Sequence, residues 1–202
     1  MAPDSKTVTA VILSGGRSTR FGSDKGLAEW RGRRLLDHVL DRVPLLGSEK
    51  LLVLREEQDI GSWLDIPIVH DDPKRNEGPL RGVIRGLAAC TTEWAWVLAC
   101  DQPLVCPALL VDILSFANGD DHAIIPEWEG RLKPLTGLYS VRSGFLLEQC
   151  SDAGEKSLIG ALKTVGFRVY DEEECRRWDP RGAGFLNINR PEHLALLEGF
   201  ET

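Results

Sequence analysis

Short apolar runs alternate along the chain with longer segments in which apolar residues recur every three or four positions. The short runs are rich in β-branched and aromatic residues and predict strands, whereas the longer segments predict amphipathic helices. The predicted strands are Val8–Leu13, Lys50–Leu54, Ile66–His70, Trp94–Ala99, Ala123–Pro126, Leu135–Val141 and Phe167–Tyr170. The predicted helices are Leu35–Val43, Pro79–Ala88, Pro107–Ala117, Ser157–Val165 and Pro191–Leu197.

This alternation of strands and helices predicts an α/β fold. We expect a three-layer, open, mostly parallel sheet flanked by helices, of Rossmann-like type, with mixed topology in the last third of the chain. The continuous apolar run Trp94–Ala99 is typical of a central parallel strand. Because the chain has 202 residues and no linker, repeat or low-complexity segment, we expect one domain covering residues 1–202.

Composition narrows the class of protein. Hydrophobic residues at 43% and charged residues at 27% are ordinary for a soluble globular protein. A net charge of -7 argues against non-specific nucleic-acid binding. No apolar run approaches the roughly 18 residues of a membrane span, and the polar start lacks a signal-peptide core, so we expect a cytoplasmic protein with no membrane partner.

The five cysteines predict free thiols rather than a bonded framework. Their number is odd and no two stand in a C-x-x-C pair, so neither a disulfide framework nor a zinc knuckle is indicated. No histidine lies near Cys100 or Cys106 in the sequence, which disfavours a catalytic cysteine.

A glycine-rich cationic loop follows the first predicted strand. Ser14-Gly15-Gly16 ends the apolar run, and Arg17, Arg20 and Lys25 come soon after. Adjacent glycines let successive backbone N–H groups converge on one anion, and the three cations add charge there. The loop matches neither a Walker motif nor G-x-G-x-x-G. A polyphosphate cradle is the favoured interpretation, and an ordinary surface turn is the alternative.

Acidic residues follow two later strands, Asp71 and Asp72 after the third and Asp101 after Trp94–Ala99. Loops at the carboxyl ends of parallel strands converge on one crevice. Cations and carboxylates at one edge suggest phosphates bridged by Mg²⁺, with Asp101 as its best-placed ligand. The alternative for Asp101 is a turn residue that satisfies the backbone.

Four motifs carry a family resemblance that spans nearly the whole chain. They are Leu13-Ser-Gly-Gly-Arg-Ser-Thr-Arg-Phe-Gly-Ser-Asp-Lys25-Gly-Leu27, Gly78-Pro-Leu-Arg-Gly82, Cys100-Asp-Gln-Pro103 and Phe185-Leu-Asn-Ile-Asn-Arg-Pro-Glu192. In these motifs and in their order, the chain resembles the molybdenum cofactor guanylyltransferases, within the nucleotidyltransferases that have a glycine-rich N-terminal signature.

The resemblance implies an enzyme that transfers GMP from GTP to molybdopterin with Mg²⁺, giving the guanine dinucleotide cofactor and pyrophosphate. It implies a nucleotide-binding part at about 7–105 and an acceptor part at about 106–202. The implied catalytic residues are Lys25, Arg20 and Asp101, the last being also the metal ligand. The implied nucleotide-binding residues are Leu13, Ser14, Gly15, Gly16, Lys25, Asp72 or its neighbour Asp71, Pro79, Leu80 and Asp101.

The acceptor side of the expected site lies in the last third. By the resemblance, Asn187 and Asn189 lie near the metal or the pterin phosphate. Lys133, with Arg131, Arg181 and Arg190, is a candidate for an anionic-substrate surface, and each is equally interpreted as a solvated charge. We expect a monomer or weak oligomer, with cofactor-delivery proteins as possible partners.

The expected chemistry needs no side-chain base, because a phosphate monoester, with a second pKa of about 6, is already mostly ionised at neutral pH. Departures from the family pattern include Ser14 for alanine, Phe21 for methionine and Arg81 for a small residue. Leu54-Arg55 stands where many relatives have an asparagine. Gln102 is reminiscent of cytidylyltransferases acting on the same cofactor. Cytidylyl transfer, transfer to another phosphorylated acceptor such as a sugar phosphate, and a non-catalytic nucleotide-binding module are the alternatives.

Overall fold

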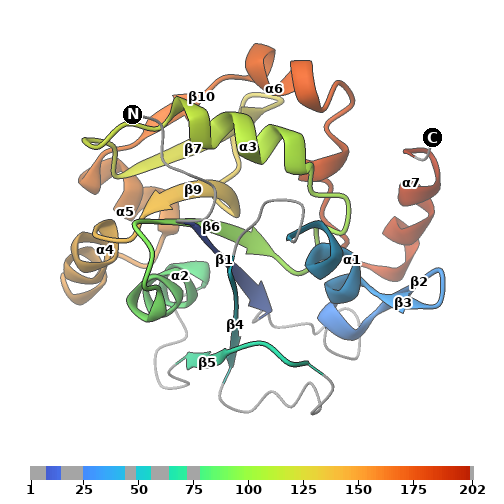
Figure 1. The fold of residues 1–202 in the computed structure, drawn as a ribbon, viewed down its shortest axis with the longest axis horizontal. Coiled ribbons are helices and arrows are strands. Elements are labelled where there is room, and N and C mark those ends of the chain that lie inside the picture. The colour runs from blue at the N-terminus through green and yellow to red at the C-terminus, as the bar shows by residue number, and fades with distance from the viewer. Residues whose placement is uncertain (1–7, 15–24, 44–48, 56–63, 72–77, 201–202) are drawn as a thin grey trace.

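A central sheet separates two layers of helices (Figure 1). The computed structural model describes residues 8–14, 25–43, 49–55, 64–71 and 78–200. The strands of the sheet are β1 (Val8–Ser14), β4 (Glu49–Arg55), β5 (Ile68–Asp71), β6 (Trp94–Ala99), β7 (Ala123–Trp128), β8 (Arg131–Leu132), β9 (Thr136–Ser140) and β10 (Arg168–Tyr170). A separate hairpin pairs β2 (Glu29–Trp30) with β3 (Arg33–Arg34). The expected α/β architecture is confirmed.

The strand order explains where a ligand crevice forms. The order is β10-β7-β9-β6-β1-β4-β5, with β8 paired to β7. From β1 the chain moves outward to β4 and β5 in parallel, then returns to β6, which lies parallel to β1 on its other side. The direction of strand addition therefore reverses beside β1, and in open α/β sheets ligands bind at such a reversal.

Beyond β6 the sheet is mixed, as expected for the last third of the chain. β9 runs antiparallel to both β6 and β7, and β10 returns to a parallel pairing with β7. The run Trp94–Ala99 does form a central strand, but only its β1 side is parallel.

Helices cover both faces of the sheet. They are α1 (Leu35–Arg42), α2 (Pro79–Ala89), α3 (Pro107–Phe116), α4 (Ser143–Asp152), α5 (Leu158–Val165), α6 (Glu172–Trp178) and α7 (Leu194–Glu198), with 3-10 turns at Lys25–Leu27, Ala183–Phe185 and Pro191–His193. Apolar residues of α1 and α3 pack on one face. Those of α2, α4 and α5 pack on the other.

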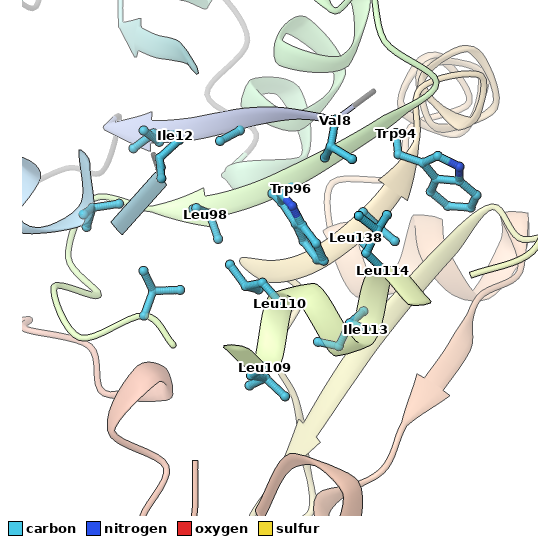
Figure 2. Packing of buried hydrophobic residues seen from close by; sticks show 14 of the residues in the cluster. Val8, Ile12, Trp94, Trp96, Leu98, Leu109, Leu110, Ile113, Leu114 and Leu138 are labelled. Atoms are coloured by element: carbon cyan, nitrogen blue, oxygen red, sulfur yellow. The ribbon is translucent and has the colours of Figure 1, made fainter. Parts of the chain in front are cut away.

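The face under α3 forms the larger part of the core (Figure 2). Val8 and Ile12 of β1 and Trp96 of β6 point to this side because strand residues two apart share a face. Leu110 and Ile113 of α3 pack onto them, and all five side chains are buried. Burying each such side chain contributes roughly 1.5–3 kcal/mol.

On the opposite face, α2 turns Gly82 and Gly86 toward β1, and it approaches the strand most closely at Gly86. A Cβ placed on Gly86 would lie 2.3 Å from Cγ1 of Val11, whereas one on Gly82 would lie 3.5 Å from Cδ2 of Leu13. The close approach at Gly86 fixes the helix against the strand. The first turn of α2 is thereby held near the carboxyl end of β1.

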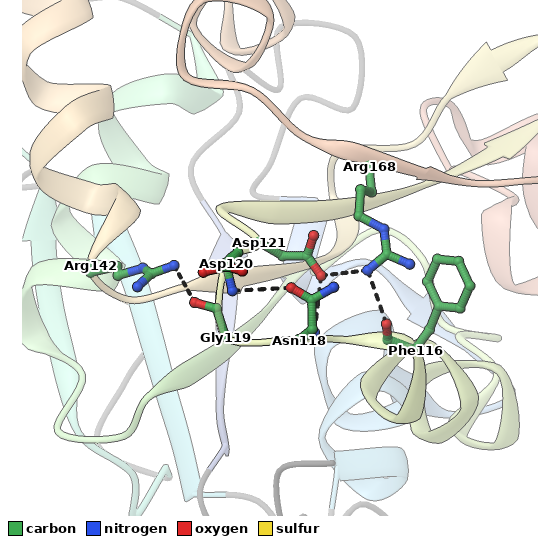
Figure 3. Close-up of polar contacts among 7 residues, drawn as sticks. All are labelled: Phe116, Asn118, Gly119, Asp120, Asp121, Arg142 and Arg168. Atoms are coloured by element: carbon green, nitrogen blue, oxygen red, sulfur yellow. Dashed lines mark hydrogen bonds and ion pairs between the residues drawn. The ribbon is translucent and has the colours of Figure 1, made fainter. Parts of the chain in front are cut away.

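A polar network fixes the turn that leads from α3 into β7 (Figure 3). The carboxylate of Asp121, which is only 8% exposed, accepts hydrogen bonds from the backbone N–H of Asn118 at 3.0 Å and from Arg168 at 2.7 Å. Arg168 also donates to the carbonyl of Phe116, and Arg142 donates to the carbonyl of Gly119. These bonds tie β10 to the start of β7.

The structure differs from the sequence predictions at several short elements. β5 begins at Ile68 rather than Ile66, and the predicted helix Pro191–Leu197 is a 3-10 turn followed by α7. The pairs β2–β3 and β7–β8 were not predicted, because β2, β3 and β8 have only two residues each, too few for a recognisable alternation. Each pair turns through two residues with positive φ, Arg31-Gly32 and Glu129-Gly130, which suits a tight hairpin.

Two helices were also missed. Of the seven residues of α6, only Cys175 is buried, so its sequence carries no apolar stripe. Besides Leu147, α4 buries only the small residues Ser143, Gly144 and Ser151, which gives a weak apolar pattern. Within the described ranges, no helix combines the length and hydrophobicity needed to cross a lipid bilayer.

Candidate functional site

The carboxyl ends of four parallel strands lie along one edge of the sheet. Ser14 pairs with Leu54 of β4, Arg55 pairs with Asp71 of β5, and Leu13 pairs with Ala99 of β6. The backbone N–H of Cys100 also donates to the carbonyl of Leu13 at 3.0 Å. The loop that carries Asp101 therefore starts beside the end of β1, at the reversal of strand order.

The predicted nucleotide-binding residues are only partly within the described ranges. Gly15, Gly16, Arg20 and Asp72 lie outside them, as does the side chain of Lys25. Ser14 is 1% exposed, and its hydroxyl has no hydrogen-bond partner among the described residues. Pro79 is exposed at the first position of α2, whereas the side chain of Leu80 is fully buried in the core. Leu80 can reach a ligand only through its backbone.

Asp101 and the two predicted asparagines come together in space. The backbone N–H of Ile188 donates to the carbonyl of Asp101 at 2.8 Å. The side chain of Ile188 is fully buried in a small apolar cluster with Trp30, Leu35 and Leu197. Ile188 is thus anchored through both backbone and side chain, which places Asn187 and Asn189, its immediate neighbours, beside the Asp101 loop.

Asp179 shapes the turn that leads into this segment. Its carboxylate is buried and accepts the backbone N–H groups of Ala183 at 2.9 Å and of Gly184 at 2.7 Å. Charge-assisted bonds of this kind are about twice as strong as neutral ones. Sequence reasoning missed Asp179, because an aspartate before proline looks like any other turn residue.

A pocket of about 380 Å³ opens next to Asn187. It is lined by Pro79, Gln102, Arg131, Leu132, Lys133, Pro134, Leu135, Lys156, Ser157, Leu158, Ile159 and Asn187. The described charged residues in this lining are three cations and no carboxylate, although the whole chain carries a net charge of -7. Half of the lining residues are apolar. The pocket therefore suits a ligand that combines an anionic group with a flat or apolar ring.

Lys133 is held over an aromatic column at the rim of this pocket. Its Nζ lies 6.0 Å from the ring centre of Phe185, which stacks on Trp128 with ring centres 5.4 Å apart, and the guanidinium of Arg176 lies over the Trp128 ring at 4.4 Å. Burial lowers the pKa of Lys133, Glu129 opposes this shift, and Arg131 adds to it. The column positions a cation that the sequence left open as a solvated charge.

The described residues offer oxygen donors but no ready-made metal cluster. No group of three histidine, cysteine, aspartate or glutamate side chains is placed to hold a metal within these ranges. The Asp101 loop and the Asn187–Asn189 segment lie side by side through the backbone bond from Ile188 to Asp101, and carboxylate and amide oxygens are hard donors of the kind that suits Mg²⁺ together with phosphate oxygens. His70 at the edge strand β5 is exposed, and its Nδ1 lies 3.3 Å from the carbonyl oxygen of Arg55.

Three of the five cysteines are held as unreactive thiols. All five are free, as predicted. Burial raises the pKa of Cys90 to about 11 and that of Cys175 to about 12, and it also raises the pKa of Cys106. Since the thiolate is the reactive form, these three thiols are unreactive at neutral pH.

Two pocket residues, Lys156 and Arg131, and one residue behind the pocket, Thr136, had little or no signal in the sequence. Lys156 precedes a predicted helix like any solvated lysine, and Arg131 was only one of four candidate cations. Thr136, fully buried in β9, donates from its hydroxyl to Oε1 of Gln102 at 3.0 Å. A contact between residues so far apart in sequence follows from the pairing of β6 with β9, which no local pattern predicts.

Comparisons with known proteins agree with this architecture. Residues 10–165 match the family model described as a MobA-like NTP transferase domain. A probable molybdenum cofactor guanylyltransferase of Chloroflexus aggregans is 34% identical over 200 residues, covering 96% of this chain and 94% of that protein. A molybdenum cofactor guanylyltransferase of Pseudomonas putida is 34% identical over 192 residues, covering 94% of this chain and 95% of that protein.

Solved structures share the fold. Molybdopterin-guanine dinucleotide biosynthesis protein A from Archaeoglobus fulgidus superposes with a TM-score of 0.81 at 24% identity, covering 95% of this chain and 97% of that one. The 2-C-methyl-D-erythritol 4-phosphate cytidylyltransferase of Thermus thermophilus gives a TM-score of 0.68 at 17% identity, covering 94% and 97%. The chain is a nucleotidyltransferase, and it belongs to the MobA-like NTP transferase family.

Proposed function

We propose that this nucleotidyltransferase transfers GMP from GTP to molybdopterin, forming the guanine dinucleotide cofactor and pyrophosphate. Relatives that match almost the full chain carry the name guanylyltransferase, which supports the choice of base and acceptor. The observation that carries the proposal is structural. Asp101 and Asn187, far apart in sequence, meet beside a pocket whose described charged residues are all cations.

In the proposed reaction, a phosphate oxygen of molybdopterin attacks the α-phosphorus of GTP. A new P–O bond forms, the bond to the bridging oxygen breaks, and pyrophosphate leaves with the electron pair. The nucleophile is mostly ionised at neutral pH, since the second pKa of a phosphate monoester is about 6. Positioning and positive charge are therefore what the protein must supply.

In this proposal, one group of residues holds the nucleotide and the metal, and a second group holds the acceptor. Backbone groups from Leu13 to Gly16 and at the start of α2 hold the nucleotide, with Asp72 or Asp71 on the base or ribose. Lys25 and Arg20 face the phosphates. Mg²⁺, when bound, neutralises charge on the phosphates. Asp101 would hold it, with the amide oxygens of Asn187 and Asn189 nearby.

The acceptor would occupy the pocket beside Asn187. Lys133 and Arg131 provide charge for its phosphate, and the apolar lining accommodates its ring system. The pocket draws Gln102 from the first part of the chain and Lys133 from the second. This supports one domain with a nucleotide-binding part at about 7–105 and an acceptor part at about 106–202. We propose that it works as a monomer or weak oligomer.

The test is pyrophosphate release from GTP and Mg²⁺ with and without molybdopterin. We expect release to depend on molybdopterin and to fall by about a hundredfold or more in Asp101→Asn and in Lys25→Ala, because each removes a preorganised charge. Asp120→Asn is the matched control, because the carboxylate of Asp120 is exposed in the turn before β7. This variant should release pyrophosphate at the wild-type rate. Circular dichroism checks that each variant is folded.

Two outcomes would overturn the proposal. Absence of metal-dependent release with any nucleoside triphosphate would favour a non-catalytic nucleotide-binding module. Release that needs a sugar phosphate instead of molybdopterin would identify a different acceptor.

A further inference from the structure

Gln102 is the most buried polar side chain of the pocket lining. It is 4% exposed and follows Asp101 directly, so it lies where the acceptor pocket meets the proposed metal ligand. The amide of a glutamine has one accepting oxygen and one donating nitrogen. If a neighbouring group binds one of these two atoms, the other atom is left to face the pocket.

Thr136 determines that orientation. The Thr136 hydroxyl, fully buried on β9, donates to Oε1 of Gln102 at 3.0 Å. This bond occupies the oxygen end of the amide. Within the described ranges, the nitrogen Nε2 has no hydrogen-bond partner, and its side chain lines the pocket. The end of Gln102 that remains for a ligand is therefore a pair of N–H donors.

The surroundings indicate what those donors would bind. The pocket combines the cations Arg131, Lys133 and Lys156 with an apolar wall. A donor that faces the pocket favours a ligand with a lone pair at that point, because a ligand that displaces water from the donor without pairing it costs free energy. A carbonyl oxygen or ring nitrogen on a phosphorylated heterocycle meets all three features.

We propose that Gln102 is a specificity-determining residue for the acceptor, and that Thr136 is the positioning residue that turns its N–H donors toward the acceptor ring. This inference rests on the proposed function for the identity of the acceptor. It gives Gln102 a role on the acceptor side of the site, distinct from the choice of nucleotide base.

The test separates acceptor binding from nucleotide binding. For wild type, Gln102→Leu and Thr136→Val, we would measure kcat and the KM values for molybdopterin and for GTP. We expect the KM for molybdopterin to rise about two- to tenfold in both variants, the range that one neutral hydrogen bond produces, while the KM for GTP changes by less than about twofold. Thr136→Ser keeps the hydroxyl and should restore the wild-type KM.

Gln149→Leu is the matched control, since Gln149 is exposed on α4 and does not line this pocket. It should leave both KM values unchanged. Thermal melting identifies any variant that loses activity by unfolding.

The inference is overturned if the KM for molybdopterin stays at the wild-type value in both Gln102→Leu and Thr136→Val, or if the KM for GTP rises equally. If wild type transfers no GMP to molybdopterin, the proposed function has failed. Fluorescence titration of the pterin, without GTP, then tests Gln102 separately: weaker binding by both variants supports its role, and equal binding contradicts it.

Discussion

Ser14 stands at the end of β1, where the family pattern has alanine. Its side chain is 1% exposed, and its hydroxyl lacks a hydrogen-bond partner within the part of the chain that the structure describes. A buried, unpaired hydroxyl costs about 1–3 kcal/mol. Since the nucleotide is proposed to meet the backbone here, the hydroxyl has no assigned role in binding.

We therefore predict that Ser14→Ala raises the free energy of unfolding by about 1 kcal/mol and leaves the KM for GTP unchanged. Urea denaturation and steady-state kinetics measure the two effects. A KM for GTP that rises by about fivefold or more, beyond what an indirect effect would give, would mean that the hydroxyl itself binds the nucleotide.

At the residue scale, the sequence predicted where candidate residues stand along the chain better than it predicted their surroundings. The placement of Asp101 at the end of a strand followed from the apolar run before it. Its meeting with Asn187 and Asn189 depends on Ile188 filling a cluster made by Trp30, Leu35 and Leu197. Such a cluster joins three separate segments and leaves no periodic signal.

At the element scale, α2 is the helix whose position matters most, because its first turn carries Pro79 into the pocket. Two of its glycines, one turn apart, face β1. At Gly86 an added Cβ would lie 2.3 Å from Val11, a distance that real Cβ atoms do not tolerate, whereas at Gly82 the nearest atom would be 3.5 Å away.

We predict that Gly86→Ala lowers the free energy of unfolding by about 1–3 kcal/mol through overpacking, although alanine favours the helix by about 1 kcal/mol. Gly82→Ala is the matched substitution on the same helix and should be neutral or stabilising by up to about 1 kcal/mol. The midpoints of urea unfolding, compared at an unchanged m-value, would measure the stability change of both variants. Equal destabilisation by the two variants would contradict the packing described.

Elements with strong periodicity were predicted well, and short ones were not. The strand Trp94–Ala99 was placed with the correct ends because six consecutive apolar residues leave little choice. The hairpin from β7 to β8 was missed, although it carries Arg131 at the pocket. Its backbone is set by positive φ angles at Glu129 and Gly130 and by the Glu172 carboxylate, which accepts the N–H of Glu129 at 2.8 Å. Contacts of that kind come from tertiary structure.

At the scale of the whole molecule, the reversal of strand order beside β1 brings the loops after β1 and β6 to one edge. The mixed second half of the sheet then adds a pocket beside that edge. The alternation of elements predicted the first half of this arrangement. The second half depends on the antiparallel insertion of β9 between β6 and β7, which the order of elements does not specify.

The proposed activity of the site at this edge of the sheet is the transfer of GMP to molybdopterin. Its most direct test is the formation of dinucleotide cofactor by the purified protein with molybdopterin and Mg²⁺, comparing kcat/KM for GTP and CTP and identifying the product by mass. A site that hydrogen-bonds one base rejects another by about a hundredfold or more. We expect kcat/KM to be higher for GTP than for CTP by at least that factor, and the product to be the guanine dinucleotide. An equal or greater kcat/KM for CTP, with a cytosine dinucleotide product, would contradict it.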